Sequence, residues 1–499
     1  MTDLFGGGAL PAAVTAYLRD TNPWWIGKPG PQLPAFRRAM FSEVLRKFKS
    51  GPTACVVVRG PRQVGKTTLQ GQLIEHLVAS EHVAPSRILR VQFDEIPSLA
   101  RVEDPVLAIG RWFEHSIQRR TFNEAARAGE VAYILLDEVQ NLSDWAPQIK
   151  SLVDHHTVRV LVTGSSSLRI EAGRDSLAGR IESVDMGTLL LREIAGLRYH
   201  ASVVPALAEN QLECLTRREF WDDLLRRGRS EGDIRNRAFA AFSERGGYPR
   251  AQEKWDVPWP EMADHLNETV IQRAISHDLR MGEVGRKRDQ TLLEEVLRLA
   301  CRYAGQAPGQ SAFVPEIKQA LHADISWQRV LAYLRFLDGA LLLRLIPPLE
   351  VRLKKRHAPS KICLCDHALR ASWLQEIVPL DPEILAQQQH LSDIAGRIAE
   401  SAAGYFLASI PHLDLAHFPE REAEPEVDYV LTVGAVRIPL EIKYRLHINP
   451  HDDTRGLRAF LEKTVYNAPF GILVTMQDGV SVPDPRILTL SLSTLLWMR

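Results

Sequence analysis

The sequence predicts an α/β protein whose first domain is a parallel β-sheet covered by helices on both faces. Between residue 51 and about residue 192, short apolar runs alternate with helical segments, a rhythm typical of parallel sheets with crossover helices. The chain has 499 residues, enough for two to four domains, and 45% of them are hydrophobic, so large cores can form. The strands expected in the first domain are 54–59, 87–93, 131–136, 158–163 and 183–191.

Composition narrows the class of protein. The 61 basic and 61 acidic residues cancel, so any contact with DNA needs a local basic patch rather than an overall charge. The five cysteines have no zinc-ribbon spacing and fit a reducing cytoplasm. No window approaches 18 uncharged apolar residues, and the N-terminus lacks the pattern of a signal peptide. We therefore expect a cytoplasmic protein without membrane contact.

Residues 60 to 67 are Gly-Pro-Arg-Gln-Val-Gly-Lys-Thr, the complete G-x-x-x-x-G-K-[ST] phosphate loop. The loop follows an apolar run and opens a helix, which is the context that the motif requires. Glycine backbone N–H groups close around phosphate oxygens, Lys66 reaches the β- and γ-phosphates, and the Thr67 hydroxyl binds Mg²⁺. We therefore expect ATP and Mg²⁺ here. The predicted nucleotide contacts are Gly60, Pro61, Arg62, Gln63, Val64, Gly65, Lys66, Thr67 and Thr68.

A second motif supports the first. An apolar strand at 133–136 ends in Asp137 and Glu138. Asp137 stands where a Walker-B acid completes the Mg²⁺ shell, and Glu138 is placed to orient or deprotonate the attacking water. The next strand runs into a serine-rich turn, where Thr163 and Ser165 are candidates for contact with the γ-phosphate or the water. Alternatively, these serines cap the following helix.

Two arginines, Arg174 and Arg180, follow this strand. An arginine here can stabilise γ-phosphate charge in a neighbouring subunit, as an arginine finger does. Arg180, which follows a glycine, is the preferred candidate and implies a homo-oligomer. The alternative is an arginine that is solvated or salt-bridged at the surface.

The rest of the chain divides into further zones. Residues 1–50 form a lead-in whose paired tryptophans, in Asn22-Pro23-Trp24-Trp25, are expected to bury against the next domain. The alternative is that they contact a partner or adenine. The ATPase core spans 51–192, and residues 193–285 are mainly helical, as in the lid of an ATPase. Residues 286–384 and 385–499 form two more domains.

Residues 286–384 are predicted to contain three helices followed by a strand, which suggests a winged helix. The third helix, 326–337, carries Trp327, Arg329, Tyr333 and Arg335, and such a helix can enter a DNA major groove. A helical connector or dimer module explains the same pattern equally well.

The last zone, 385–499, holds a second set of charged residues. If the hairpin turns at 434–435, Asp428 lies opposite Glu441, with Cβ atoms about 5 Å apart. A divalent metal would relieve their repulsion, Lys443 on the same face could activate a bound water, and the helical acid Glu400 could complete the shell. These are the parts of a metal-dependent phosphodiesterase. The alternative is a surface hairpin with unpaired charges.

The order of these parts resembles a widespread family of prokaryotic ATPases that join an AAA+ domain to a C-terminal winged helix and a restriction-endonuclease-like domain. This resemblance implies an AAA+-like P-loop NTPase sheet with a helical lid, then a winged helix and a C-terminal α/β endonuclease-like domain. It implies ATP and Mg²⁺ binding at the matching residues, and a second site at Glu400, Asp428, Glu441 and Lys443. The residues that carry it are Asn22-Pro23-Trp24-Trp25, Gly60 to Thr68, Leu136 to Gln140, Thr163-Gly164-Ser165, Leu177 to Arg180, Gly246 to Pro249, Asp428 and Glu441-Ile442-Lys443.

The function expected from the sequence is that of a Mg²⁺-dependent AAA+ ATPase that couples its nucleotide state to engagement of nucleic acid. A nuclease activity of the C-terminal site is included in this expectation as a possibility. The rival hypothesis is a nucleotide-switched protein-interaction module whose C-terminal domain does not cleave. Glu138 favours turnover over a passive switch, because a switch can dispense with an acid that orients water.

Overall fold

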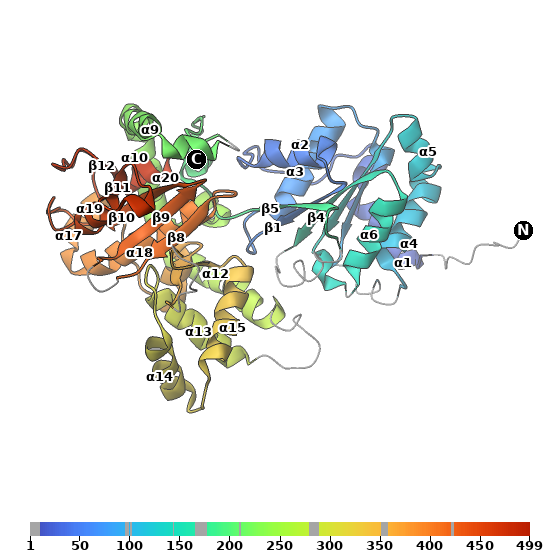
Figure 1. The fold of residues 1–499 in the computed structure, drawn as a ribbon. Coiled ribbons are helices and arrows are strands. Elements are labelled where there is room, and N and C mark those ends of the chain that lie inside the picture. The colour runs from blue at the N-terminus through green and yellow to red at the C-terminus, as the bar shows by residue number, and fades with distance from the viewer. Residues whose placement is uncertain are drawn as a thin grey trace, which may run out of the picture. The chain divides into compact units, whose positions relative to one another are not determined.

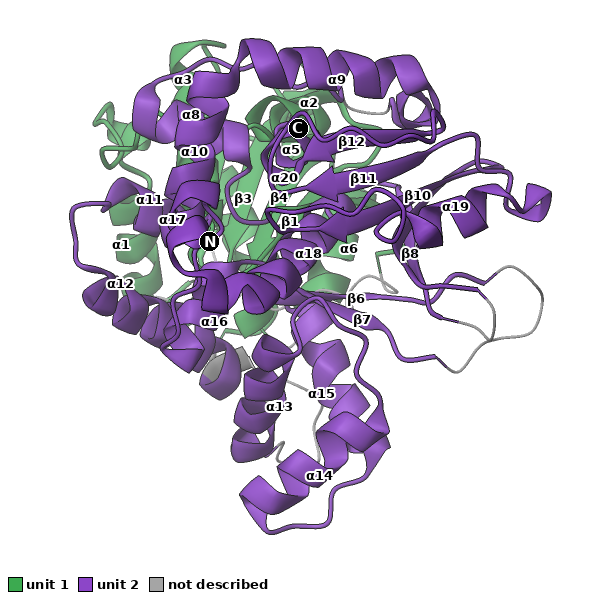
Figure 2. Ribbon diagram, turned by 90° about the vertical axis from the view of Figure 1, so that its left-hand side faces the viewer, with its two compact units in different colours: residues 1–186, 277–286 green, residues 187–276, 287–499 purple. Residues whose placement is uncertain are grey.

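The computed structural model describes residues 10–94, 99, 102–142, 144–164, 177–208, 211–278, 289–350, 358–420 and 424–499. The chain forms two compact units, coloured separately in Figure 2. Unit 1 comprises Met1–Met186 and His277–Arg286, and unit 2 comprises Gly187–Ser276 and Lys287–Arg499. Among the residues that the structure describes, none of the helices combines the length and apolar character that a membrane crossing requires.

Unit 1 is built on a five-stranded sheet in the order β2-β3-β4-β1-β5, with every neighbouring pair parallel. Four strands lie within a residue of their predicted bounds, and β4 separates the phosphate-loop strand β1 from β3, which carries the second motif. The strands are β1 (Cys55–Arg59), β2 (Ile88–Gln92), β3 (Ala132–Asp137), β4 (Val158–Gly164) and β5 (Ile181–Asp185).

Helices cover both faces of this sheet. Figure 1 shows α2 and α3 on one side of the strands and α4, α5 and α6 on the other. Alternate strand residues share one apolar core with α1, α4, α5 and α6, while the residues between them face the other way, so the central strands are buried on both faces. The helices are α1 (Ala12–Thr21), α2 (Phe41–Ser50), α3 (Lys66–Ala79), α4 (Pro105–Phe113), α5 (Phe122–Arg127) and α6 (Trp145–His155).

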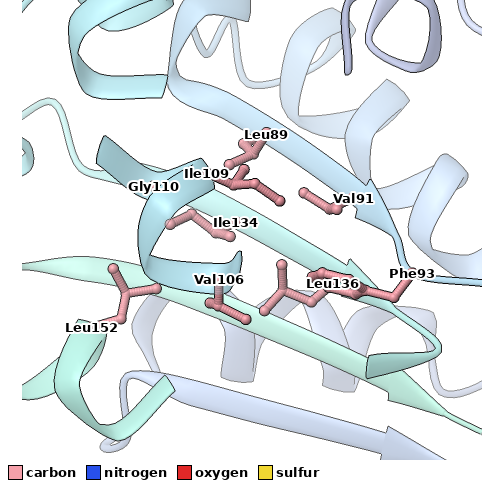
Figure 3. A pocket seen from close by; sticks show the side chains of 9 residues that line it. All are labelled: Leu89, Val91, Phe93, Val106, Ile109, Gly110, Ile134, Leu136 and Leu152. Atoms are coloured by element: carbon pink, nitrogen blue, oxygen red, sulfur yellow. The ribbon is translucent and has the colours of Figure 1, made fainter. Parts of the chain in front are cut away.

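The core of unit 1 is closely packed. Its small void of about 10 Å³, shown in Figure 3, is lined only by apolar side chains and glycine. A void of this size without polar partners holds neither a ligand nor a stable water. The lining residues are Leu89, Val91, Phe93, Val106, Ile109, Gly110, Ile134, Leu136 and Leu152.

The predicted strand at 183–191 is wrong in its bounds. Strand β5 ends at Asp185, and helix α8 (Leu191–Tyr199) begins where the prediction continued the strand. The N–H of Leu190 donates to the Glu193 carboxylate at 2.8 Å, which caps the new helix. The apolar residues just before α8 therefore belong to a helix start and not to a strand.

Unit 2 begins with the helical zone predicted after the ATPase core. Arg235 on α10 donates to Thr494 Oγ1 at 2.5 Å and pairs with Asp478 at 2.7 Å, so this zone is joined to the C-terminal residues. The helices are α8, α9 (Arg218–Ser230), α10 (Gly232–Arg245), α11 (Pro249–Glu253) and α12 (Trp259–Leu266), continued by the π-helical turns η7 (Asn267–Gln272) and η8 (Ala274–Asp278).

The next module contains the three helices and the strand that the sequence predicts, with one further strand. Helices α13 (Gln290–Arg302), α14 (Gln310–Leu321) and α15 (Trp327–Gly339) precede an antiparallel pair, β6 (Leu343–Ile346) and β7 (Lys361–Leu364). On α15, Tyr333 is buried and Trp327 packs near Phe313, whereas Arg329 and Arg335 are exposed. The winged-helix identity of this module stays a prediction.

The C-terminal domain contains a five-stranded mixed sheet in the order β12-β11-β10-β9-β8. Strands β8 to β10 are antiparallel, and β10 to β12 are parallel. The strands are β8 (Asp414–Phe418), β9 (Val427–Val433), β10 (Val436–Lys443), β11 (Gly471–Thr475) and β12 (Ile487–Ser491). The helices are α16 (His367–Leu374), α17 (Pro382–Gln387), α18 (Ser392–Ala408), α19 (Arg455–Leu461) and α20 (Leu492–Leu496).

Candidate functional site

The phosphate loop connects β1 to α3 and needs its glycines. A Cβ on Gly60 would lie 2.1 Å from the carbonyl oxygen of Met186, and Gly65 has a φ of +98°. Gln63 also has a positive φ, 64°. From the lead-in, the Arg38 guanidinium donates to the Val64 carbonyl at 2.8 Å. The close contact at Gly60 therefore restricts one end of the loop, and the hydrogen bond from Arg38 restricts its middle.

The Lys66 side chain is folded into this loop. It is 6% exposed, and its ammonium donates to the carbonyls of Gly60 at 2.9 Å and Pro61 at 2.7 Å. An ammonium has three donors, and it can exchange carbonyl partners for phosphate oxygens without a large change of position. Lys66 thus lies where the motif predicts it.

Asp137, at the end of β3, joins three of the predicted site residues. Its fully buried carboxylate accepts hydrogen bonds from the Thr67 hydroxyl at 2.8 Å and from the Thr163 hydroxyl. The backbone N–H of Glu138 adds a third donor at 3.1 Å. The structure therefore brings Thr67, Asp137 and Thr163 together as the sequence predicts.

Two residues that the motifs do not mark support this group. Gln70 on α3 is fully buried and donates to the Thr163 hydroxyl at 2.8 Å. The Arg90 guanidinium on β2 donates to the side-chain amide oxygen of Gln70 at 3.4 Å and lies 3.8 Å from the Asp137 carboxylate. Arg38, Gln70 and Arg90 belong to no phosphate-loop pattern, and sequence reasoning missed them.

Glu138 follows Asp137 in a left-handed backbone conformation, with a φ of 51°. Its carboxylate contacts the amide of Gln140. Burial raises the pKa of Glu138, while the positive charges of Lys66 and Arg62 oppose that rise. An acid whose pKa moves toward neutrality is better suited to take up a proton from water.

The surroundings of the other predicted site residues do not by themselves indicate a role in binding a nucleotide. Arg180 pairs with Asp154 of α6 at 2.5 Å and is about a third exposed, and this pairing raises the pKa of the Arg180 guanidinium. Thr68 lies half-buried in α3. Ser165 and Arg174 lie outside the described residues.

The acidic residues of the C-terminal domain surround a lysine that the sequence did not reveal. Lys361, the first residue of β7, is 1% exposed. Its ammonium contacts the Glu400 carboxylate and lies 3.1 Å from Asp428 Oδ1 and 3.4 Å from Glu426 Oε1. It also lies 5.1 Å from the centre of the Tyr429 ring. Burial alone lowers the pKa of Lys361, but the nearby carboxylates outweigh it and raise the pKa.

This arrangement differs from the predicted metal site. The β9–β10 register has the predicted alignment, with Leu440 opposite Tyr429, and the N–H of Ile442 donates to Asp428 at 2.8 Å. However, the Lys361 ammonium holds Glu400 and Asp428, and no group of three possible ligands among the described residues is arranged around an ion. A metal shell of Glu400, Asp428 and Glu441 therefore does not fit this geometry.

Glu441 has a separate partner. Lys443 donates to Glu441 Oε1 at 2.5 Å, while Oε2 is buried without a hydrogen-bond partner in the described part of the chain. Burial raises the pKa of Glu441 to about 8, with Asp428 acting in the same direction. An oxygen without a donor fits a carboxyl group that carries a proton. Lys443 thus pairs with Glu441 on one face, as its position in the strand predicts.

Comparison with protein families identifies two segments. Residues 53–195 match the model of an AAA domain, and residues 236–378 match a domain of unknown function (DUF8612). Two proteins described as uncharacterized, Mb2031c of Mycobacterium bovis and Rv2008c of Mycobacterium tuberculosis, are each 31% identical over 163 residues. These matches cover 32% of this chain and 30% of each relative.

Two solved structures show weaker likeness. The Aeropyrum pernix ORC1 protein in complex with DNA has a TM-score of 0.29 and 14% identity, with coverage of 73% of this chain and 97% of that chain. PCH-2 of C. elegans has a TM-score of 0.23 and 16% identity, with coverage of 50% and 62%. Scores this low define no common arrangement of the chains.

The sheet, the phosphate loop and the family match together define the class of unit 1. Residues 53–195 form an AAA domain with the fold of P-loop nucleotide-binding proteins. The family match to residues 236–378 assigns no chemistry to unit 2.

We predict that Lys361→Met destabilises unit 2, by roughly 3–5 kcal/mol, because it leaves buried carboxylates without their countercharge. Urea unfolding of the full chain measures this change. Lys463→Met, at an exposed pair with Glu424, is the matched control and should change stability little. Adding Glu400→Gln to Lys361→Met should recover part of the loss. An unaltered unfolding curve for Lys361→Met would contradict the role of the ammonium.

The same geometry reverses the change in stability that two opposed carboxylates alone would give. Opposed carboxylates at 428 and 441 imply that removing one stabilises the metal-free protein. In the structure, Asp428 accepts from Lys361 and from Ile442, and these contacts lower the pKa of Asp428 despite burial. Asp428→Ala should therefore destabilise unit 2 rather than stabilise it.

The raised pKa of Glu441 predicts a pH dependence. The folded protein holds a proton on Glu441 up to a pKa of about 8, whereas the unfolded chain releases it near 4.5. This stabilising contribution is complete below pH 4.5 and is lost as pH rises through 8, with a slope of at most about 1.4 kcal/mol per pH unit. Urea titrations at pH 5, 6.5 and 8.5 should show a flatter dependence for Glu441→Gln. If the unfolding free energy changes with pH equally in the wild type and in Glu441→Gln, Glu441 is not the group responsible.

Proposed function

We propose that unit 1 binds and hydrolyses ATP in a Mg²⁺-dependent reaction. One observation carries this proposal: Lys66, Thr67, Asp137 and Glu138 converge at the ends of β1 and β3, in an AAA domain. The hydroxyl of Thr67 and the carboxylate of Asp137, 2.8 Å apart, are the kind of oxygen ligands that Mg²⁺ takes. Bound Mg²⁺ supplies charge neutralisation for the β- and γ-phosphates.

Each side chain then has a defined task. Lys66 exchanges the loop carbonyls for phosphate oxygens, and the loop N–H groups surround the same phosphates. Thr163, held by Gln70, fixes the orientation of the Asp137 carboxylate. Glu138 accepts a proton from the attacking water, a role that its raised pKa favours.

Lys66→Ala should abolish ATP binding, because it removes the ammonium that contacts the β- and γ-phosphates. Glu138→Gln should bind ATP normally yet lose hydrolysis, by roughly 10²-fold or more, since the water loses its base. Nucleotide binding and phosphate release are measured on the same preparations. Glu75→Gln, an exposed substitution on α3, serves as the control. Hydrolysis by Glu138→Gln at the wild-type rate would remove Glu138 from the mechanism.

We also propose that the active form is a homo-oligomer in which Arg180 reaches the site of a neighbouring subunit. Support comes from its partly exposed position after β4 and before β5. Within one chain it pairs with Asp154, but exposed pairs of this kind contribute little and can exchange for a phosphate.

For unit 2, we propose that the module from α13 to β7 contacts nucleic acid. On α15, Arg329 and Arg335 are exposed six residues apart, and Arg329 lies 3.4 Å from the half-exposed Asp289. Between β6 and β7, residues 351–357 have the sequence Val-Arg-Leu-Lys-Lys-Arg-His. Arg329 and Arg335 supply local basic charge, which a neutral chain needs to bind a polyanion, whereas residues 351–357 lie outside the described part of the structure.

We further propose that the C-terminal domain binds its partner without cutting it. The Lys361 ammonium supports this hypothesis, because it already compensates the carboxylates that a nuclease site would use for a metal. In this proposal, Asp428, Glu441 and Lys443 contribute to the stability of the domain and not to hydrolysis.

Arg329→Gln/Arg335→Gln should weaken binding of duplex DNA by roughly tenfold and reduce the salt slope by about 2, as expected when two phosphate contacts are lost. Fluorescence anisotropy at several salt concentrations measures both effects. Arg455→Gln, an exposed arginine on α19, should leave the affinity unchanged. Gel analysis of the same mixtures with Mg²⁺ or Mn²⁺ should show intact DNA. Unchanged binding by the double variant would exclude α15, and cleavage abolished by Asp428→Ala would overturn the non-cleaving assignment.

A further inference from the structure

Unit 2 contains a cavity of about 130 Å³ that neither the ATP site nor the exposed face of α15 includes. Its walls come from the end of α13, from α16 and from the first turns of α18. The volume exceeds that of the apolar void in unit 1 by an order of magnitude and accommodates several waters or a small anion. The lining residues are Arg302, Ala304, Arg370, Ile394, Arg397 and Ile398.

The chemistry of this lining is unusual. Three of the six residues are arginines, the others are apolar, and no carboxylate belongs to the lining as described. Like charges around one cavity repel each other, and an apolar wall lowers the local dielectric and strengthens that repulsion. Glu376 and Glu316, which lie outside the lining, pair with two of these arginines, and an anion inside the cavity would offset the repulsion that remains.

Arg370 is the most deeply placed of the three. It is 5% exposed, and one terminal nitrogen contacts the half-exposed Glu376. A guanidinium carries five N–H donors in a planar fork, so the contact with Glu376 that the described residues provide leaves donors that a ligand in the cavity can use. Arg370 therefore provides a buried and preorganised anion contact.

The other two arginines are more accessible. Arg302 lies 3.7 Å from Glu316, and both side chains are more than a third exposed, so this pair contributes little. Arg397, one turn into α18, is exposed at the cavity. The cavity thus has one buried guanidinium and two at its rim, an arrangement that lets an anion enter from solvent.

We propose that this three-arginine cavity binds a phosphate group. A tetrahedral phosphate has oxygen acceptors that point in several directions, so it can accept from three guanidinium groups on different helices. A planar carboxylate is satisfied by one or two guanidinium groups. Two sources supply this group: free phosphate or a small phosphorylated metabolite, and a backbone phosphate of nucleic acid. The proposal does not depend on ATP hydrolysis, because every lining residue belongs to unit 2.

The test uses the full chain with Lys66→Ala, so that the phosphate loop does not contribute to binding. Inorganic phosphate is titrated calorimetrically against a chloride control of equal ionic strength. We expect saturable binding of phosphate, weakened about tenfold or more by Arg397→Gln and by Arg302→Gln, as expected for the loss of a charged hydrogen bond. Arg229→Gln, exposed on α9, is the matched control. The two rim variants avoid the buried Arg370, whose replacement can disturb folding.

The outcomes are distinct. The proposal is overturned if phosphate does not bind beyond the chloride control, or if both rim variants bind phosphate as tightly as the parent protein. Saturable binding that the rim variants weaken supports it, whether or not wild-type protein hydrolyses ATP. A short single-stranded oligonucleotide added in competition then assigns the source: displacement of phosphate indicates a nucleic-acid backbone, and its failure indicates a free phosphate or metabolite.

Discussion

The burial of carboxylates at strand ends is the constraint on which both units depend. A carboxylate removed from water needs hydrogen-bond donors or a countercharge, since its isolated burial is far too costly. In unit 1, Asp137 is fully buried and accepts from two threonine hydroxyls and a backbone N–H. In unit 2, Asp428 is nearly as buried and is compensated mainly by the ammonium of Lys361. These two ways of compensating a buried carboxylate have different consequences for the chemistry of each site.

Hydroxyl groups satisfy a carboxylate without neutralising it. The Thr67 hydroxyl and the Asp137 carboxylate lie 2.8 Å apart, and the hydroxyl can turn its oxygen toward a cation that approaches the pair. Lys361 instead adds a full positive charge between Glu400 and Asp428, and a divalent cation would have to displace that ammonium or repel it. The two carboxylates thus differ in their partners: hydroxyls and a backbone N–H bind Asp137, whereas an internal salt bridge to Lys361 compensates Asp428.

The sequence predicted what is local and missed what is distant. The phosphate loop, Asp137 and Glu138 lie in continuous motifs, and the β9–β10 register follows from the position of one turn. Lys361 contacts Asp428 from 67 residues away, and Gln70 reaches Thr163 across 93 residues, so no spacing rule marks either contact. The predicted β9–β10 register was correct. The metal site inferred from it was not supported, because Lys361 of strand β7 supplies the positive charge beside Asp428. The fifth strand of unit 1 was misplaced because an apolar run begins a helix as readily as it continues a strand.

The lead-in shows how a segment outside the motifs supports the site. Strand β2 is an edge of the sheet, and an edge strand exposes unpaired backbone groups. Asn22 covers this edge, since its amide donates to the Arg90 carbonyl at 2.9 Å and accepts from the Arg90 N–H at 2.7 Å. Trp24 and Trp25 both donate to the Ile88 carbonyl, so the paired tryptophans bury against the following domain as the sequence predicts. These contacts fix the backbone from which Arg90 extends toward Gln70 and Asp137. The lead-in therefore protects the sheet edge and, through Arg90, places a positive charge beside the carboxylate on which the proposed reaction depends.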